Sequence, residues 1–111
     1  MSGQEPKWRL VSEPIFPDRD RIDLAGMPLG EPGVPMRFLW RGEAYEVAAV
    51  LDRWKGTARE GGRADGETYV RRHYLDLRTT AGQRMVIYCD RQQRRGKSRW
   101  WLYRLAEAPT P

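Results

Sequence analysis

The chain contains one cysteine and one histidine among its 111 residues. A lone Cys89 excludes an internal disulfide bond and is typical of a protein in a reducing compartment. A zinc site needs about four nitrogen, sulfur or oxygen ligands, and the sequence has no CxxC or HxxxH pair to supply them. We therefore expect no metal and no cofactor. Cys89 is predicted to be a buried thiol, and His73 a packed histidine.

The common signatures of catalysis are also missing. The sequence has no G-x-S-x-G motif, no P-loop and no G-x-G-x-x-G motif. Its glycine-rich stretch "EGGRADG" lacks the lysine and the strand-to-helix setting of a phosphate-binding loop. Asp76 and Asp90 are isolated carboxylates, and nothing in the sequence pairs them as a general acid and base. We expect that the protein is not an enzyme.

Long apolar runs are absent as well. No stretch approaches the roughly 20 apolar residues of a membrane-spanning helix. The N-terminal "MSGQEPKWRL" lacks the apolar region of a signal peptide. The sequence therefore predicts a cytoplasmic protein that makes no membrane contact. A hydrophobic fraction of 40%, with five tryptophans and five tyrosines, argues against general disorder.

Positive charge is what the chain does have. Twenty lysines and arginines stand against fifteen aspartates and glutamates, which gives a net charge of +5. Most of the cations are arginines, whose planar guanidinium suits phosphate binding and ring stacking. A positive net charge bears on which molecules a protein associates with and not on its fold. It is also found in proteins that bind no nucleic acid.

The distribution of proline and of apolar residues predicts three segments in the chain. Residues 1–35 hold six of the eight prolines and are predicted to be an N-terminal segment without a useful helix. Within it, 7–15 could form an edge strand that ends at Pro14, and 17–35 an irregular strap. Residues 36–106 are predicted to be an antiparallel β-domain, and 107–111 a disordered tail.

Alternating apolar residues predict strands in the β-domain. Two extended runs flank Gly42 in "MRFLWRGEAYEVAAVLDRW", although a helix over "EAYEVAAVLDRWK" is the main rival. An exposed loop over 55–67, a strand over 68–80 and a tight turn at 81–82 follow. We predict a mostly β fold, with five or six antiparallel strands in a meander that curls into a half-open barrel. The predicted core residues are Phe38, Trp40, Val47, Leu51, Leu75, Leu77, Ile87, Trp100 and Leu102.

One stretch combines charge with aromatic rings. Residues 90–105, "DRQQRRGKSRWWLYRL", carry six cations and three rings. Adjacent tryptophans in a strand point to opposite faces, so Trp100 is placed in the core and Trp101 on the other face. The candidate nucleic-acid-binding residues are Arg91, Arg94, Arg95, Lys97, Arg99, Trp101 and Tyr103.

This stretch has three interpretations. An exposed Trp101 beside cations would suit base stacking with phosphate neutralisation. The loop could instead be a solvated turn whose cations discourage strand pairing, with Trp101 in a second small core under the Pro-rich segment. The third interpretation is a surface that docks a protein.

The pattern of aromatic and turn residues resembles a small bacterial domain family of unknown function. It also resembles the C-terminal segment of ImuB, a catalytically inactive relative of Y-family polymerases in a bacterial mutagenic repair complex. The resemblance covers roughly residues 8–16 and 35–106, and a long Pro-rich insertion over 17–35 departs from it. The matching positions are Phe38, Trp40, Arg41, Gly42, Tyr45, Val47, Arg72, Tyr74, Leu75, Leu77, Thr79, Gly82, Trp100 and Leu102.

The resemblance implies a fold and no catalytic residues. We expect a small non-enzymatic binding module, linked to DNA repair or mutagenesis by the resemblance, with a basic and aromatic edge for DNA or RNA. The alternative is a protein-docking domain in a repair or polymerase complex, without nucleic-acid contact of its own.

Overall fold

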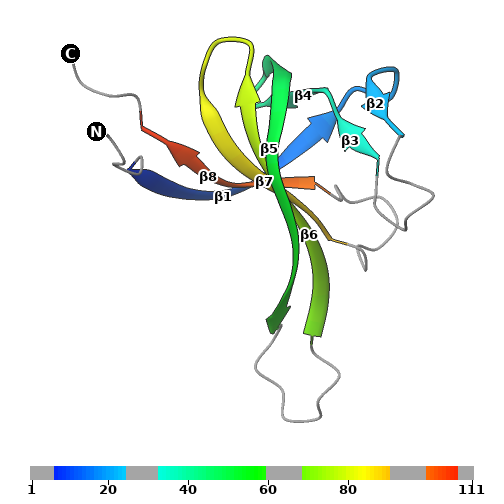
Figure 1. The fold of residues 1–111 in the computed structure, drawn as a ribbon, viewed down its shortest axis with the longest axis vertical. Helices are drawn as coiled ribbons and strands as arrows, with labels where there is room; N and C mark the ends of the chain where they lie inside the picture. The colour runs from blue at the N-terminus through cyan, green and yellow to red at the C-terminus, as the bar shows by residue number, and fades with distance from the viewer. Residues whose placement is uncertain (1–6, 25–32, 60–68, 91–99, 108–111) are drawn as a thin grey trace.

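Eight β-strands make up the part of the chain that the computed structural model describes, residues 7–24, 33–59, 69–90 and 100–107 (Figure 1). No helix occurs in these ranges. The strands are β1 (Trp8–Pro17), β2 (Ile22–Asp23), β3 (Val34–Pro35), β4 (Arg37–Trp40), β5 (Glu43–Arg59), β6 (Tyr69–Thr79), β7 (Arg84–Asp90) and β8 (Trp100–Ala106).

Six of the strands form a closed barrel in the order β1-β4-β5-β6-β7-β8, and all neighbouring pairs are antiparallel. The two short strands β2 and β3 pair separately. The prediction of a mostly β, antiparallel sheet that curls on itself is confirmed. The curl lets so short a chain cover its own apolar face.

β1 lies between two strands, so the prediction of an edge strand is wrong. Residues up to Ile15 pair with β8, and Phe16 and Pro17 then pair with β4. The prolines did not prevent this, because Pro14 follows a bulge in which Ser12 has a φ of 56° and Pro17 ends the strand. β1 thus closes the ring of strands.

Two tight turns lie where glycines predicted them. Arg41 and Gly42 join β4 to β5 with φ angles of 53° and 80°, a pair of positive values typical of a two-residue hairpin. Gly82, with a φ of 88°, lies in the turn between β6 and β7. Because positive φ is unfavourable for a residue with a side chain, Arg41 needs support from its surroundings.

Glu13 of β1 supplies that support. Its carboxylate accepts hydrogen bonds from Arg41 Nε at 2.8 Å and from a terminal guanidinium nitrogen of Arg41 at 2.7 Å. The indole N–H of Trp40 donates to the same carboxylate at 2.8 Å. The bonds from Arg41 and then Trp40 lower the pKa of Glu13 from 4.5 to about 2. Trp40 and Arg41, two consecutive positions that carry the family resemblance, therefore bind the β4–β5 turn to β1.

β5 is longer and less regular than the sequence indicates. The helix over "EAYEVAAVLDRWK" does not form, and β5 contains register shifts between Val47 and Ala49 and between Val50 and Asp52. Each extra residue reverses the alternation of side chains. Leu51 is consequently 41% exposed, and its prediction as a core residue is wrong.

Beyond the barrel, β5 and β6 continue as a two-stranded arm (Figure 1). β4 pairs with β5 only from Glu43 to Glu46, whereas β6 pairs with it up to Arg59. The prediction of a loop over 55–67 is therefore wrong for 55–59, which pair with β6 despite the presence of Gly56. The rest of that loop lies outside the described residues.

The interior contains the other predicted core residues. Phe38, Trp40, Val47, Leu75, Leu77, Ile87, Trp100 and Leu102 are all buried. His73 and Cys89 are also buried and directly paired across β6 and β7, as the predictions of a packed histidine and a buried thiol require. Trp100 is 7% exposed and is the core tryptophan of the adjacent pair.

Candidate functional site: an aromatic row on the outer face

Four aromatic residues from four neighbouring strands lie in one cross-strand row. Trp54 of β5 pairs directly with Tyr74 of β6, Tyr74 with Tyr88 of β7, and Tyr88 with Trp101 of β8. Pro14 of β1 continues the register beyond Trp101. We call Trp54, Tyr74, Tyr88 and Trp101 the aromatic row.

The rings of the aromatic row are in contact along its length. Trp54 and Tyr74 stack with centroids 5.4 Å apart and planes 6° apart. Tyr88 and Trp101 stack with centroids 6.4 Å apart and the same 6° angle. Between the two stacks, Tyr74 and Tyr88 are tilted by 50° at 5.5 Å. Directly opposite side chains on one sheet face are near neighbours, and aromatic pairs of this kind stabilise a sheet.

The aromatic row lies on the outer face of the barrel. Each of its members on β6, β7 and β8 is next in sequence to a core residue, namely Leu75, Ile87 and Trp100. Successive side chains of a strand point to opposite faces. Exposure differs along the row, because Tyr88 is buried, Tyr74 and Trp101 are half-buried, and Trp54 is 37% exposed.

A bulge brings Tyr103 beside the aromatic row. The register of β7 and β8 shifts between Val86 and Ile87, so Tyr103 and Arg104 are both half-buried while Leu105 is buried in the core. Strand alternation alone would place Tyr103 and Leu105 on the same face, and the bulge separates them. Tyr103 makes edge contacts with Tyr74 at 5.7 Å and with Tyr88 at 6.2 Å.

Gly56 gives the ring of Tyr74 its space. A Cβ atom at Gly56 would lie 2.8 Å from Cε2 of Tyr74, a distance that no ordinary contact allows. Glycine inside a strand marks such a close approach. The position of the Tyr74 ring beside Trp54 therefore requires a residue without a side chain at position 56.

Arg72 places a cation over the aromatic row. Its guanidinium carbon lies 4.3 Å from the centroid of the Tyr88 ring, within the range of a cation–π contact. Burial lowers the pKa of Arg72, but a hydrogen bond with Tyr74 and the nearby Tyr88 and Asp90 leave that pKa raised overall. Among the described residues, its Nε has no hydrogen-bond partner.

A second group of cations and one ring lies on the same face. Arg104 and Arg84 approach the ring of Trp8, with guanidinium carbons 4.4 Å and 5.4 Å from its centroid. Arg84 also donates to Asp76 at 2.6 Å, so Asp76 is a structural carboxylate with an ion-pair partner. Arg104 and Asp76 lie two residue pairs away from the aromatic row, on β8 and β6.

The predicted site residues are only partly described. Trp101 and Tyr103 lie together around Tyr88, on the outer face as the alternation predicts. The five predicted cations, Arg91, Arg94, Arg95, Lys97 and Arg99, lie outside the described residues. The segment that carries them joins Asp90 to Trp100, one residue pair from Tyr88 and Trp101.

Sequence reasoning missed most of the aromatic row. Trp54, Tyr74 and Tyr88 were not among the candidates, and neither was Arg72. Two of them could have been found from the sequence. Tyr74 precedes Leu75 and Tyr88 follows Ile87, and because both neighbours were predicted to face inward, the two tyrosines must face outward. Trp54 could not have been found in this way, since its face depends on the bulges of β5.

Other kinds of site find no support in the described ranges. No group of three or more His, Cys, Asp or Glu side chains there is placed to hold a metal ion. The same ranges contain no helix of the length and apolarity that crossing a membrane requires.

One comparison with known proteins is informative. A family model described as "Domain of unknown function (DUF6504)" matches residues 2–107, which is nearly the whole chain. The chain therefore belongs to this family, and the predicted resemblance to a family of unknown function is confirmed. No match was found among curated proteins or among solved structures. The resemblance to ImuB stays a prediction.

Proposed function

We propose that this member of a family of unknown function is a small non-enzymatic binding module for single-stranded nucleic acid. The aromatic row would stack bases, and the cations beside it would neutralise phosphates. Rings that stack any base, combined with a basic surface, are the usual basis of sequence-tolerant binding to single strands.

The observation that carries the proposal is the aromatic row itself. A sheet face that only had to be soluble would not need four rings in consecutive register, and a single exposed ring would need no explanation. Arg72 adds a cation directly above the row. Trp54 and Trp101, at the two ends of the row, expose part of their rings.

The sequence of 91–99 adds to this support. Five of these residues are cationic, and the described residues that flank the segment, Asp90 and Trp100, are two positions from Tyr88 and one position from Trp101 in the sequence. Cations near a base-stacking surface would contact the phosphates that join the bases. The module would then bind in the cytoplasm, where the single buried Cys89 stays reduced.

The test is fluorescence anisotropy with labelled single-stranded DNA and RNA at two salt concentrations. Binding should weaken steeply with salt, because each neutralised phosphate releases counterions. Replacing Arg94 and Arg95 together with alanine should lower the salt slope by roughly two units if both contact phosphates.

The matched control is Arg9→Ala with Arg78→Ala, which removes two exposed cations of β1 and β6 outside the aromatic row. The control variant should have a salt slope closer to that of the unchanged protein than the variant without Arg94 and Arg95 has. If the parent protein binds neither DNA nor RNA at micromolar concentration, the proposed function is wrong.

An exposed apolar pair favours a second candidate, a protein-docking module. Phe16 and Leu39 pair directly across β1 and β4 and are 58% and 45% exposed. Such a module would bind its partner, a repair or polymerase protein by the resemblance to ImuB, with little dependence on salt. Phe16→Ser would weaken that binding and leave any binding of nucleic acid unchanged.

A further inference from the structure

A pocket of about 130 Å³ lies where β5 and β6 leave the barrel, against Val34 of β3. The lining includes two cations, Arg53 and Lys55, and the histidine His73. Leu75 and Val34 supply apolar wall. We call this the basic pocket.

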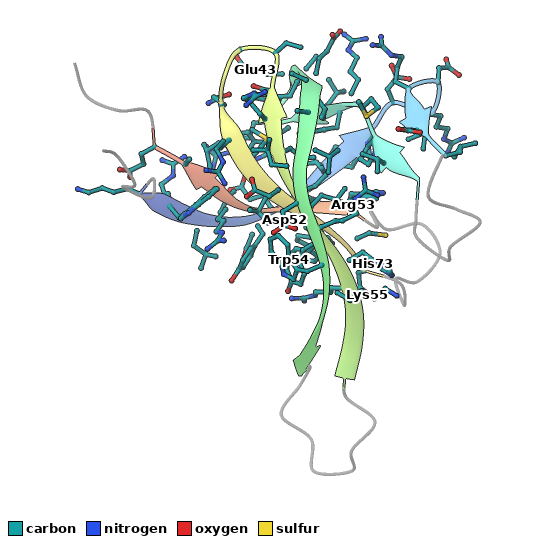
Figure 2. The ribbon with its side chains drawn as sticks, in the orientation of Figure 1. Glu43, Asp52, Arg53, Trp54, Lys55 and His73 are labelled. Carbon is teal, nitrogen blue, oxygen red and sulfur yellow. The ribbon has the colours of Figure 1, made fainter. Side chains whose placement is uncertain are left out.

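The register of β5 and β6 explains why these three residues meet. Arg53 and Lys55 are two residues apart on β5, and alternate side chains of a strand share a face. Lys55 pairs directly with His73 of β6. Figure 2 shows Arg53, Lys55 and His73 together on one side of the β5 ribbon.

Although most of its wall is apolar, the charged groups of the basic pocket favour an anion. Two of its side chains are cations, and no Asp or Glu is among the described residues that line it. A single buried water needs roughly 10–15 Å³ of such volume, so 130 Å³ has room for a group the size of a phosphate. Arg and Lys are the usual partners of phosphate oxygens.

The basic pocket adjoins the aromatic row. Trp54 and Tyr74, two of the four members of the row, also line the pocket. Trp54 lies on the opposite side of β5 from Arg53 and Lys55, by strand alternation. In the described part of the chain, β4 pairs with β5 only as far as Glu46. No described strand therefore pairs with the outer edge of β5 at Trp54, and a bound strand can pass over it.

We propose that the basic pocket binds a phosphate monoester, the terminal phosphate of a single strand that stacks on the aromatic row. The inference rests on the proposed function and adds to it a preference for strand ends. A terminal monoester carries about −1.5 to −2 charges near pH 7, and a linking phosphate carries about one. Two cations and a histidine in one small pocket therefore favour the terminal group.

The experiment compares three forms of one short oligothymidylate: 5′-phosphorylated, 3′-phosphorylated and unphosphorylated. Each carries its fluorescent label at the unmodified end or within the strand. One phosphorylated form should bind about tenfold more tightly than the unphosphorylated form, as expected for at least one added charge-assisted hydrogen bond. Excess inorganic phosphate should reduce this preference.

Lys55→Ala is the decisive variant. Lys55 is exposed, so its removal should leave the fold intact. It should abolish most of the tenfold preference, whereas Arg78→Ala, an exposed cation of β6 outside the pocket, should preserve it. His73→Gln, checked for an unchanged melting temperature, should also reduce the preference.

The outcomes separate this inference from the proposed function. Equal binding of all three oligonucleotides overturns the inference and leaves the proposed function intact. If none of the oligonucleotides binds, the proposed function is wrong. The pocket is then tested by adding inorganic phosphate and following the NMR signals of His73, which is the only histidine in the sequence. Ring shifts that Lys55→Ala removes would then support a site for free phosphate or a small phosphate ester. Unchanged ring resonances would overturn the pocket as well.

Discussion

Trp100 and Trp101 are neighbours in β8 and have opposite environments. Trp100 is 7% exposed, pairs with Cys89 and belongs to the core. Trp101 is half-buried on the outer face, where it stacks on Tyr88. The same kind of side chain thus fills the interior at one position and ends a row of surface rings at the next.

The two faces of the sheet differ in the same way. On the inner face, aliphatic residues such as Leu77, Ile87 and Leu102 are fully buried. On the outer face, the neighbours of Leu75, Ile87 and Trp100 are the rings of Tyr74, Tyr88 and Trp101, and Arg72 lies over Tyr88. Packing alone explains the three aliphatic residues of the inner face. The outer face leaves part of the Trp54 and Trp101 rings exposed, which is why we propose that it carries the binding function.

The largest effect is expected on the inner face. Trp100→Ala removes a large buried side chain and should lower the free energy of unfolding by about 3 to 5 kcal/mol, enough to unfold a small domain. Thermal or urea unfolding followed by circular dichroism measures it. A Trp100→Ala protein that melts at the parent temperature would contradict the comparison of the two faces.

Trp101→Ala should act mainly on binding. Its ring is only half-buried, so the loss of stability should be well below that of Trp100→Ala. The binding free energy for single-stranded nucleic acid should weaken by about 1 to 3 kcal/mol if the ring stacks on a base. Unfolding and anisotropy on the same preparation separate the two effects. A variant that loses stability as severely as Trp100→Ala would make the aromatic row a second core.

A pH effect is expected at Glu13, which pairs with Leu102 on the inner side of β1. Because its pKa is lowered from 4.5 to about 2, its bonds to Trp40 and Arg41 contribute stability that is present above pH 4.5. This contribution is lost as the pH falls toward 2. The indole N–H resonance of Trp40 should titrate over this window, and Glu13→Gln should remove the titration. A midpoint near 4.5 would show that the bonds do not persist in solution.

The smallest effect is expected at Leu51. Its side chain is 41% exposed, so Leu51→Ala should change the free energy of unfolding by less than about 0.5 kcal/mol. Leu77→Ala, which empties a fully buried position, should cost about 2 to 5 kcal/mol. Similar costs for both variants would mean that the bulges of β5 do not turn Leu51 outward.

Much of the fold could be predicted from local patterns. Alternation in 68–80, with glycines at 42 and 82, placed β6 and two turns correctly. These features depend on the preferences of a few consecutive residues. The pairing of β1 with both β4 and β8 could not be predicted, because it brings together residues about 20 and 90 positions apart.

The candidate site shows the same division. The sequence alone determined a mostly β chain and opposite faces for Trp100 and Trp101, because strand alternation follows from the backbone. Only the tertiary structure decided that Trp54, Tyr74 and Tyr88 align with Trp101, and that Arg53, Lys55 and His73 share one pocket. These arrangements depend on register between strands and on the two bulges of β5. A shift of one residue would turn each strand's side chains to the other face.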